Sequence, residues 1–135
     1  MKKPIDIDAL VAEAVPMRPN PQLAFTMPVR TVSEANAREH WRTRHKRKRE
    51  QQEAVQLAWR HAIKTPWFAS LPCVVRITRI GPRRLDTDNL AGSFKHVQDG
   101  IAKEMGVDDG DGRIKWEYEQ VAVGKKVYSV RVEVY

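Results

Sequence analysis

The chain of 135 residues has a single cysteine and no long hydrophobic run. Cys73 alone excludes an intramolecular disulfide and a zinc ribbon, and its place beside Val74 and Val75 is typical of a small buried hydrophobe. No apolar run approaches the roughly 18 residues that a transmembrane helix needs. The sequence therefore predicts no membrane partner, and the lone thiol is consistent with an intracellular, reducing compartment.

Acidic residues are the scarcer charge, because 17 Asp and Glu stand against 24 Lys and Arg, giving a formal net charge of +7. A nucleic acid explains this balance better than an acidic metabolite does. Aspartates are nevertheless concentrated in residues 86–88 and 108–111. Carboxylates gathered in a basic protein indicate a bound cation, and Asp oxygens suit Mg²⁺ or Mn²⁺. A divalent metal together with a polyanion is typical of phosphodiester chemistry.

The hydrophobic pattern predicts one α/β domain in residues 23–135, preceded by a flexible or loosely docked tail in residues 1–22. The tail includes a short amphipathic stretch from Ile5 to Val15, followed by three prolines that interrupt helical structure. In the domain, β-branched or alternating segments predict strands and 3.6-residue periodicity predicts helices. The predicted strands are 23–29, 73–80, 113–121 and 126–134, and the predicted helices run from about 33 to 64 and from 88 to 105. The order β-α-β-α-β-β predicts a mixed sheet with two main helices, the last two strands forming a hairpin through residues 123–125.

The ends of the two helices have recognisable signals. Ser33 or Asn36 is predicted to cap the first helix, and Pro66 to end it. Asp88 is predicted to cap the second helix, and Gly106 to end it.

The second helix predicts how the acids are arranged. Its apolar residues fall on one stripe that can face the sheet: Leu90, Phe94, Val97, Ile101 and Met105. Asp88, Lys95 and Asp99 fall on the opposite side, and Asp86 lies in the loop before the helix. The turn at 108–111 follows the far end of the helix. Either the next strand begins near Asp86, or a second subunit supplies part of the site.

A purely structural explanation of the same residues stays open. Asp88 can be a helix cap, and residues 108–112 can be a polar turn, since Asp and Gly favour turns. Asp99 can pair with Lys95 and Lys103 on the surface.

The segment from Arg83 to Leu90 resembles the Asp-x-Asp-Asn-Leu signature of RusA-like Holliday-junction resolvases. Lys95, the step Asp99-Gly100 and residues 111–114 resemble the later motifs of that family, and the resemblance spans about residues 25–134. Residues 29–36 and 39–41 are similar to the start of phage and prophage members.

The resemblance implies a RusA-like fold and a homodimer with two Mg²⁺-dependent sites, in which Mn²⁺ can substitute. Such an enzyme nicks opposed strands of a four-way DNA junction in recombination and repair, without a small-molecule cofactor, in the cytoplasm of a bacterium or phage-infected cell. The metal ligands would be Asp86, Asp88 and Asp111, with Asp109 as the second choice for the third ligand and Lys95 assisting catalysis. Lys95 follows Asp88 by seven residues where the family more usually has four.

Cations flank this site in the sequence. The predicted DNA contacts are Arg42, Arg44, Lys46, Arg47, Lys48, Arg49, Arg79, Arg83 and Arg84. Their alternative roles are a solvated helix face and, for the last three, countercharge for Asp86. Four tryptophans, Trp41, Trp59, Trp67 and Trp116, can stack on bases, although packing explains most of them.

Two other functions remain as alternatives. A non-catalytic nucleic-acid-binding module would use the cations alone, with the acids as caps and turns. A metal-dependent nuclease for flap or other branched DNA would use the same site on a different substrate.

Overall fold

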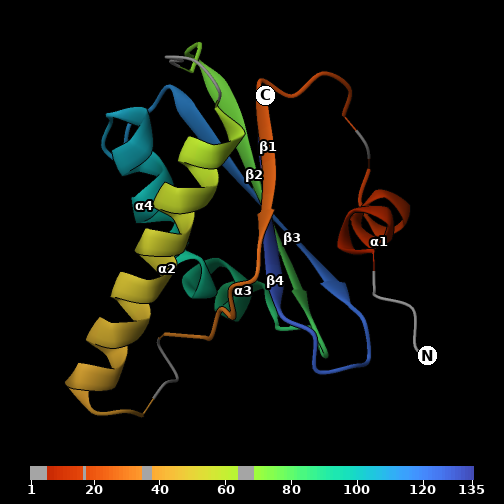
Figure 1. Cartoon of the computed structure of the whole chain (residues 1–135), viewed down its shortest axis with the longest axis vertical. Coiled ribbons are helices and arrows are strands. Elements are labelled where there is room, and N and C mark those ends of the chain that lie inside the picture. Colours follow the sequence, from red (N-terminus) through yellow and green to blue (C-terminus); the bar gives the residue numbers. More distant parts are fainter. Residues whose placement is uncertain (1–5, 17, 35–37, 64–68) are drawn as a thin grey trace.

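A computed structural model describes residues 6–16, 18–34, 38–63 and 69–135. They form one four-stranded mixed sheet with helices on both faces (Figure 1). The elements in chain order are α1 (Ile7–Ala14), β1 (Leu23–Met27), α2 (Trp41–Ala62), β2 (Cys73–Gly81), α3 (Thr87–Ser93), α4 (Lys95–Met105), β3 (Ile114–Ala122) and β4 (Ser129–Val134). The predicted α/β domain on a mixed sheet is confirmed, with four helices in place of two main ones. Asn36, Pro66 and Trp67 lie outside the described residues.

The last two strands do not form the predicted hairpin. The strand order is β1-β4-β2-β3, and β3 runs parallel to β2, with Ile114 opposite Cys73 and Ala122 opposite Gly81. β4 runs antiparallel to both β1 and β2 and lies between them. The hairpin prediction is wrong because the connection occupies residues 123–128. This length lets the chain pass the end of β2, whereas a hairpin would need only a tight turn.

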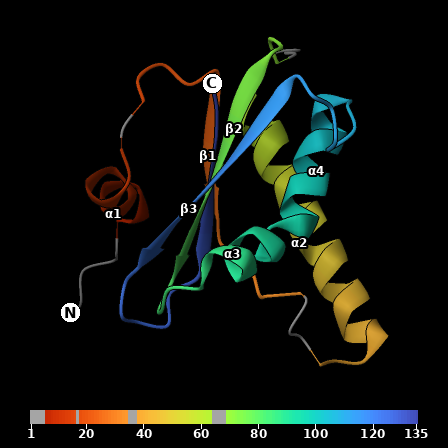
Figure 2. The ribbon, with the colours of Figure 1, turned by 180° about the vertical axis from the view of Figure 1, so that it is seen from behind.

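One face of the sheet carries the main hydrophobic core. Helices α2 and α4 lie together over this face (Figure 1; Figure 2, from behind). Trp59 of α2 meets Phe25 of β1 edge-on, with ring centroids 6.1 Å apart. A Cβ added to Gly100 of α4 would lie 3.3 Å from the Cβ of Val55, which is fully buried in α2. The absence of a side chain at Gly100 therefore allows the two helices to approach closely.

The opposite face of the sheet is partly covered by α1 (Figures 1 and 2). A small apolar cluster holds the helix there: Val11, Val15, Ile80 and Val121. The rest of this face is polar, with a buried ion pair between Arg76 and Glu133 at 2.9 Å. Arg76 also donates a hydrogen bond to the carbonyl of Pro16. The segment after α1 is thus attached to the sheet by a polar contact as well as by apolar packing.

The cap of α2 differs from the prediction. The helix begins at Trp41, and Nδ1 of His40 accepts a hydrogen bond from the backbone N–H of Arg42 at 3.2 Å. The prediction that Ser33 caps this helix is wrong, because its hydroxyl donates to Asn89 instead. No helix in the described part of the chain combines the length and the apolar character needed to cross a membrane.

The predicted second helix is divided into α3 and α4 at Phe94, whose backbone has φ −92° and ψ 0°. The buried ring of Phe94 stacks on Tyr118, with centroids 5.5 Å apart. The predicted apolar stripe is confirmed as core-facing: Leu90, Phe94, Val97 and Ile101 are buried and Met105 is partly buried. The break places Asp88 in α3 and leaves Lys95 and Asp99 four residues apart in α4, so the prediction that one continuous helix carries all three is wrong. Gly106 ends α4 in the left-handed region, with φ 73°, as predicted.

Candidate functional site

The first candidate site lies where β2 leads into α3. Asp86 is the N-cap, and its carboxylate accepts hydrogen bonds from the backbone N–H and the side-chain amide of Asn89, both at 2.9 Å. The prediction that Asp88 caps the helix is wrong, because it lies in the first turn and is exposed. Among the described residues, none donates a hydrogen bond to the Asp88 carboxylate. Two carboxylates therefore stand at a helix N-terminus, where negative charge is favoured.

Two side chains of the sheet hold the loop before α3. Gln120 of β3 pairs with the backbone of Leu85: its Oε1 accepts from the Leu85 N–H and its Nε2 donates to the Leu85 carbonyl, both at 2.8 Å. Arg79 of β2 donates to the carbonyl of Arg83 at 2.8 Å. The Arg79 guanidinium also lies against Gly81, where a Cβ would come within 2.8 Å of it. These contacts fix the path of the backbone that leads into the two carboxylates.

A short strap, Ser33-Glu34, connects three helices beside this loop. The Ser33 hydroxyl donates to the side-chain oxygen of Asn89 in α3 at 2.7 Å. The Glu34 carboxylate accepts two hydrogen bonds of 2.8 Å from Arg47 in α2 and lies 3.4 Å from Nε2 of His96 in α4. The hydrogen bonds from Arg47 lower the pKa of Glu34, and burial lowers the pKa of His96. The strap therefore positions the start of α3 relative to α2 and α4.

A basic groove of about 540 Å³ adjoins the strap. Its lining comes from the strap, α2, α3 and α4: Glu34, Arg44, His45, Lys48, Gly92, Lys95 and His96. Lys95 thus lies with the cations of α2, while Asp99 follows it by four residues on α4. Cations that converge on a concave surface focus a positive potential, which attracts an anion.

The turn after α4 lies at the other end of the sheet (Figure 1). Asp111 precedes Ile114, which pairs with the first residue of β2, whereas Asp86 follows the last residue of β2. A nine-residue strand spans roughly 25 Å at about 3.3 Å per residue. In the described ranges, no three His, Cys, Asp or Glu side chains are grouped so that they could hold a metal ion. The suggestion that β3 begins near Asp86 is wrong, and the contribution of a second subunit stays a prediction.

The carboxylates of this turn have local partners. Asp111 forms an ion pair with Arg113 at 2.7 Å, and the hydrogen bonds from Arg113 lower the pKa of Asp111 to about 2. Asp109 is exposed and has acidic neighbours instead: its hydrogen bond with Asp108, desolvation and the nearby charge of Asp99 raise its pKa. Asp111 is already neutralised within its own turn, whereas Asp109 would gain from a bound cation. The choice between them as a metal ligand stays open.

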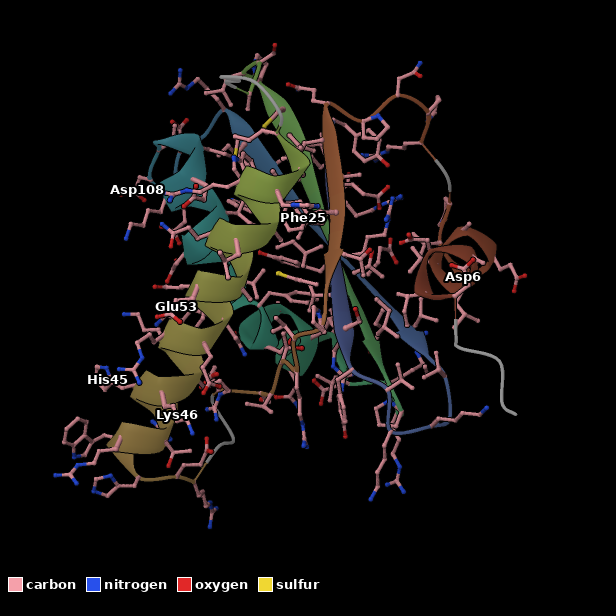
Figure 3. All side chains as sticks on the ribbon, in the orientation of Figure 1. Asp6, Phe25, His45, Lys46, Glu53 and Asp108 are labelled. Carbon is pink, nitrogen blue, oxygen red and sulfur yellow. The ribbon has the colours of Figure 1, made fainter. Side chains whose placement is uncertain are left out.

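The basic segment of α2 extends away from the sheet (Figure 3, His45 and Lys46). Its predicted DNA-contacting side chains are exposed with one exception: Arg42, Arg44, Lys46, Lys48 and Arg49 are exposed, and Arg47 is not. The side chain of Arg47 is 14% exposed and bridges Glu34 and Glu39 at 2.8 and 2.6 Å. Arg83 and Arg84 are exposed beside Asp86, whereas Arg79 is buried.

Sequence reasoning missed Gln120 and the Ser33-Glu34 strap. Gln120 has one sequence signal, because it occupies the core-facing series of β3, in which Ile114, Trp116 and Tyr118 are apolar or aromatic. A polar side chain in such a series often satisfies a nearby backbone group. The strap has no comparable signal, since its partners lie on three other elements.

Two carboxylates beside a basic groove can bind a divalent cation together with a phosphate. Mg²⁺ is usually held by one or two carboxylates, several waters and substrate phosphates, so Asp86 and Asp88 suit it. The cations of the groove would bind the phosphates that flank such an ion. No protein-family model and no curated protein matches this chain.

Proposed function

We propose that the protein is a Mg²⁺-dependent endonuclease that cuts branched DNA, with the four-way junction as its substrate. One observation carries the proposal: the carboxylates of Asp86 and Asp88 stand at the start of α3, the helix whose Gly92 lines the basic groove. The same helix therefore carries acids for a cation at its start and lines a basic groove for a polyanion near its end. The similarity of residues 83–90 to the RusA-like signature supports the same function.

The roles of the side chains follow from their positions. Asp86 and Asp88 would hold Mg²⁺, or Mn²⁺ in its place. The bound ion would polarise a phosphodiester and lower the pKa of a water molecule. Lys95 would offset negative charge on the phosphate that is cut, and the exposed cations of α2 would hold neighbouring phosphates.

A homodimer completes the proposal. The third carboxylate, from Asp111 or Asp109, would come from the partner, because within one chain both lie at the far end of the sheet from Asp86. A two-fold symmetric dimer would also present two equivalent sites to a four-way junction, whose arms allow paired nicks.

The test is incubation of the protein with labelled four-way junctions in Mg²⁺ and in EDTA. We expect symmetric paired nicks with the metal and none without it. Asp88→Asn should lose cleavage and keep junction binding, because Asp86 retains the cap of α3. Glu13→Gln, which removes an exposed carboxylate from α1, is the control and should cut normally. Absence of cutting by the unaltered protein with every divalent ion and salt concentration would refute the proposal, as would normal cutting by Asp88→Asn.

The separation of the two acidic clusters in one chain favours a second candidate, a non-catalytic nucleic-acid-binding module. That module would bind DNA tightly, lose affinity as salt rises and show no dependence on metal. A nuclease for other branched DNA is distinguished by supplying junction, flap and duplex substrates side by side.

A further inference from the structure

The structure distinguishes Trp41 from the other described tryptophans. Trp59 is buried, and the indole N–H of Trp116 donates to the carbonyl of Asp109 at 3.0 Å. Trp67 lies outside the described residues. Trp41 is 60% exposed and is the first residue of α2. This end of the helix extends away from the sheet (Figure 1). The Trp41 indole is therefore available to a partner.

The groups around Trp41 flank its ring without covering it. The guanidinium of Arg42 lies 5.5 Å from the ring centroid. The ring of His45 approaches edge-on, with centroids 5.5 Å apart, and His40 lies at the same distance in a tilted arrangement. These neighbours restrict how the indole can turn, while most of its surface stays in water.

The charges near Trp41 are unfavourable for the helix itself. The first turn of α2 has no acid, although negative charge is what stabilises a helix N-terminus. Arg42 and Lys46 are four residues apart, as are Arg44 and Lys48, and like charges at this spacing destabilise a helix. A departure from local preference of this kind is expected at functional sites. An anionic partner would relieve the repulsion.

His45 and Lys48, further along α2 from Trp41, each line two grooves of the helical layer. They line the 540 Å³ groove that contains Lys95, and they also line a second groove of about 350 Å³ between α2 and α4, where Lys103 adds a further cation. The first groove includes Gly92 of α3, whereas the second also contains the acids Glu53 and Glu104. A strand whose base rests on Trp41 and that follows the first groove would therefore have cations along its backbone in the direction of α3.

We propose that Trp41 stacks on an unpaired base of DNA while the neighbouring phosphates lie on the cations of α2. The inference rests on the proposed function for the class of its partner and extends it, because it assigns a preference for DNA whose bases are not all stacked. Stacking on an aromatic side chain combined with a positive groove is the general mode of binding to single strands. A blunt duplex presents no free base face, except at its ends, for the indole to cover.

The test measures affinity in EDTA, so that cleavage plays no part. The probes are a labelled single-stranded oligodeoxynucleotide of mixed sequence and a blunt duplex of equal length. Trp41→Ala should weaken binding to the single strand by about 5- to 100-fold, with little change for the duplex. Trp41→Phe should retain part of the affinity, because a smaller ring still stacks.

Two further variants separate stacking from charge. Leu57→Ala is the matched control, since Leu57 is 72% exposed on the same helix and lies outside the basic segment; it should bind like the unaltered protein. Lys48→Gln should reduce the slope of log affinity against log salt by about 0.7 on the single strand. Trp41→Ala should leave that slope unchanged.

The inference is overturned if Trp41→Ala binds the single strand normally, or if it weakens the single strand and the duplex equally. A matching oligoribonucleotide distinguishes the source of the base: a loss confined to RNA would overturn the assignment to DNA. A protein that binds as expected in EDTA but cuts no junction in Mg²⁺ would support the inference and refute the proposed nuclease.

Discussion

The two ends of the sheet carry the same kind of residue in different surroundings. At the α3 end, Asp86 caps the helix by accepting hydrogen bonds from Asn89, and the preceding loop is held by Gln120 from β3. At the turn end, Asp111 is bound by Arg113 of its own turn, and Asp109 meets other acids. The first end is assembled from distant parts of the chain, and the exposed Arg83 and Arg84 precede Asp86. The second is a local turn in which one acid is paired with an arginine and another lies beside further acids.

The comparison shows why a cluster of acids in the sequence does not define a site. Carboxylates bind a cation when the fold holds them near one another with few competing partners. Asp86 accepts hydrogen bonds from the neutral Asn89, and no described residue donates to Asp88, whereas Asp111 has a competing cation in Arg113. A complete three-carboxylate site would need the two ends to meet, and in a dimer they would come from different chains.

The largest predicted effect comes from mixing variants of the two ends. Asp88→Asn and Asp111→Asn should each lower junction cleavage by at least about 100-fold, since even groups that only support a metal ligand contribute 10- to 100-fold. A heterodimer of the two variants keeps one intact site if each site takes Asp88 from one chain and Asp111 from the other. Random pairing then restores about a quarter of the normal number of sites.

The measurement is the initial cleavage rate after the two variants are unfolded and refolded together. Each variant refolded with itself is the control and should stay inactive. A mixture that also stays inactive, although heterodimers are detected by mass, would show that the two ends do not combine. Substituting Asp109→Asn for Asp111→Asn in the same mixture decides which carboxylate of the turn takes part.

The next effect concerns two ion pairs, Arg47–Glu34 in the strap beside α3 and Arg113–Asp111 in the turn at the other end of the sheet. Arg47→Met should lower the free energy of unfolding by about 2–4 kcal/mol, because it leaves the mostly buried Glu34 carboxylate without its hydrogen bonds. Arg113→Met should change stability little, since the Arg113 side chain is 60% exposed and its pair with Asp111 is screened by water. Urea unfolding of both variants measures the difference. Equal losses would mean that the two ends are held with similar strength.

The sequence predicted the parts of the fold that depend on local pattern. The apolar stripe of the second helical region, the first strand and the stop at Gly106 follow from spacing and residue type, and the structure has them. The hairpin failed because alternation identifies a strand without naming its partner. Ser33 failed as a cap because a distant Asn89 competes for its hydroxyl.

The candidate site was likewise predictable only where it depends on residues close together in the sequence. Asp86 and Asp88 are neighbours in the chain, so their proximity was predictable. Gln120 and Glu34 act through partners 35 and 13 residues away, and such contacts depend on topology that a single sequence does not state. The distance from Asp86 to the turn at 108–111 depends on β3 being parallel to β2, which the hairpin prediction did not include.

A smaller effect is expected from the clamp on the loop. Gln120→Ala should lower the free energy of unfolding by about 1–2 kcal/mol, because it leaves the N–H and carbonyl of Leu85 without partners. It should also reduce cleavage more than Gln98→Ala does. Gln98 is the control because its side chain accepts a hydrogen bond from Tyr118 outside the loop. If the free energy of unfolding of Gln120→Ala equals that of the unaltered protein, water molecules take over the two hydrogen bonds to the Leu85 backbone.

The smallest effect is the pH dependence of the turn end. The pKa of Asp111 is lowered to about 2 from 3.8, so its contribution to stability is present above about pH 4 and is lost as the pH falls towards 2. Arg113→Met should remove this loss, because the hydrogen bonds from Arg113 cause the shift.

The pKa shift of Asp109 has the opposite sign. Its pKa is raised, so its ionisation disfavours the folded state and stability falls as the pH rises through that pKa. Asp109→Asn should therefore be slightly more stable than the unaltered protein at pH 7 and lose this advantage at pH 3, where the carboxyl is protonated. Urea midpoints at the two pH values measure both shifts. A urea midpoint for Asp109→Asn below that of the unaltered protein at pH 7 would mean that the Asp109 carboxylate already has a favourable partner in the folded protein. The two ends of the sheet would then differ from the present comparison, because both acids of the turn would be stabilised within it.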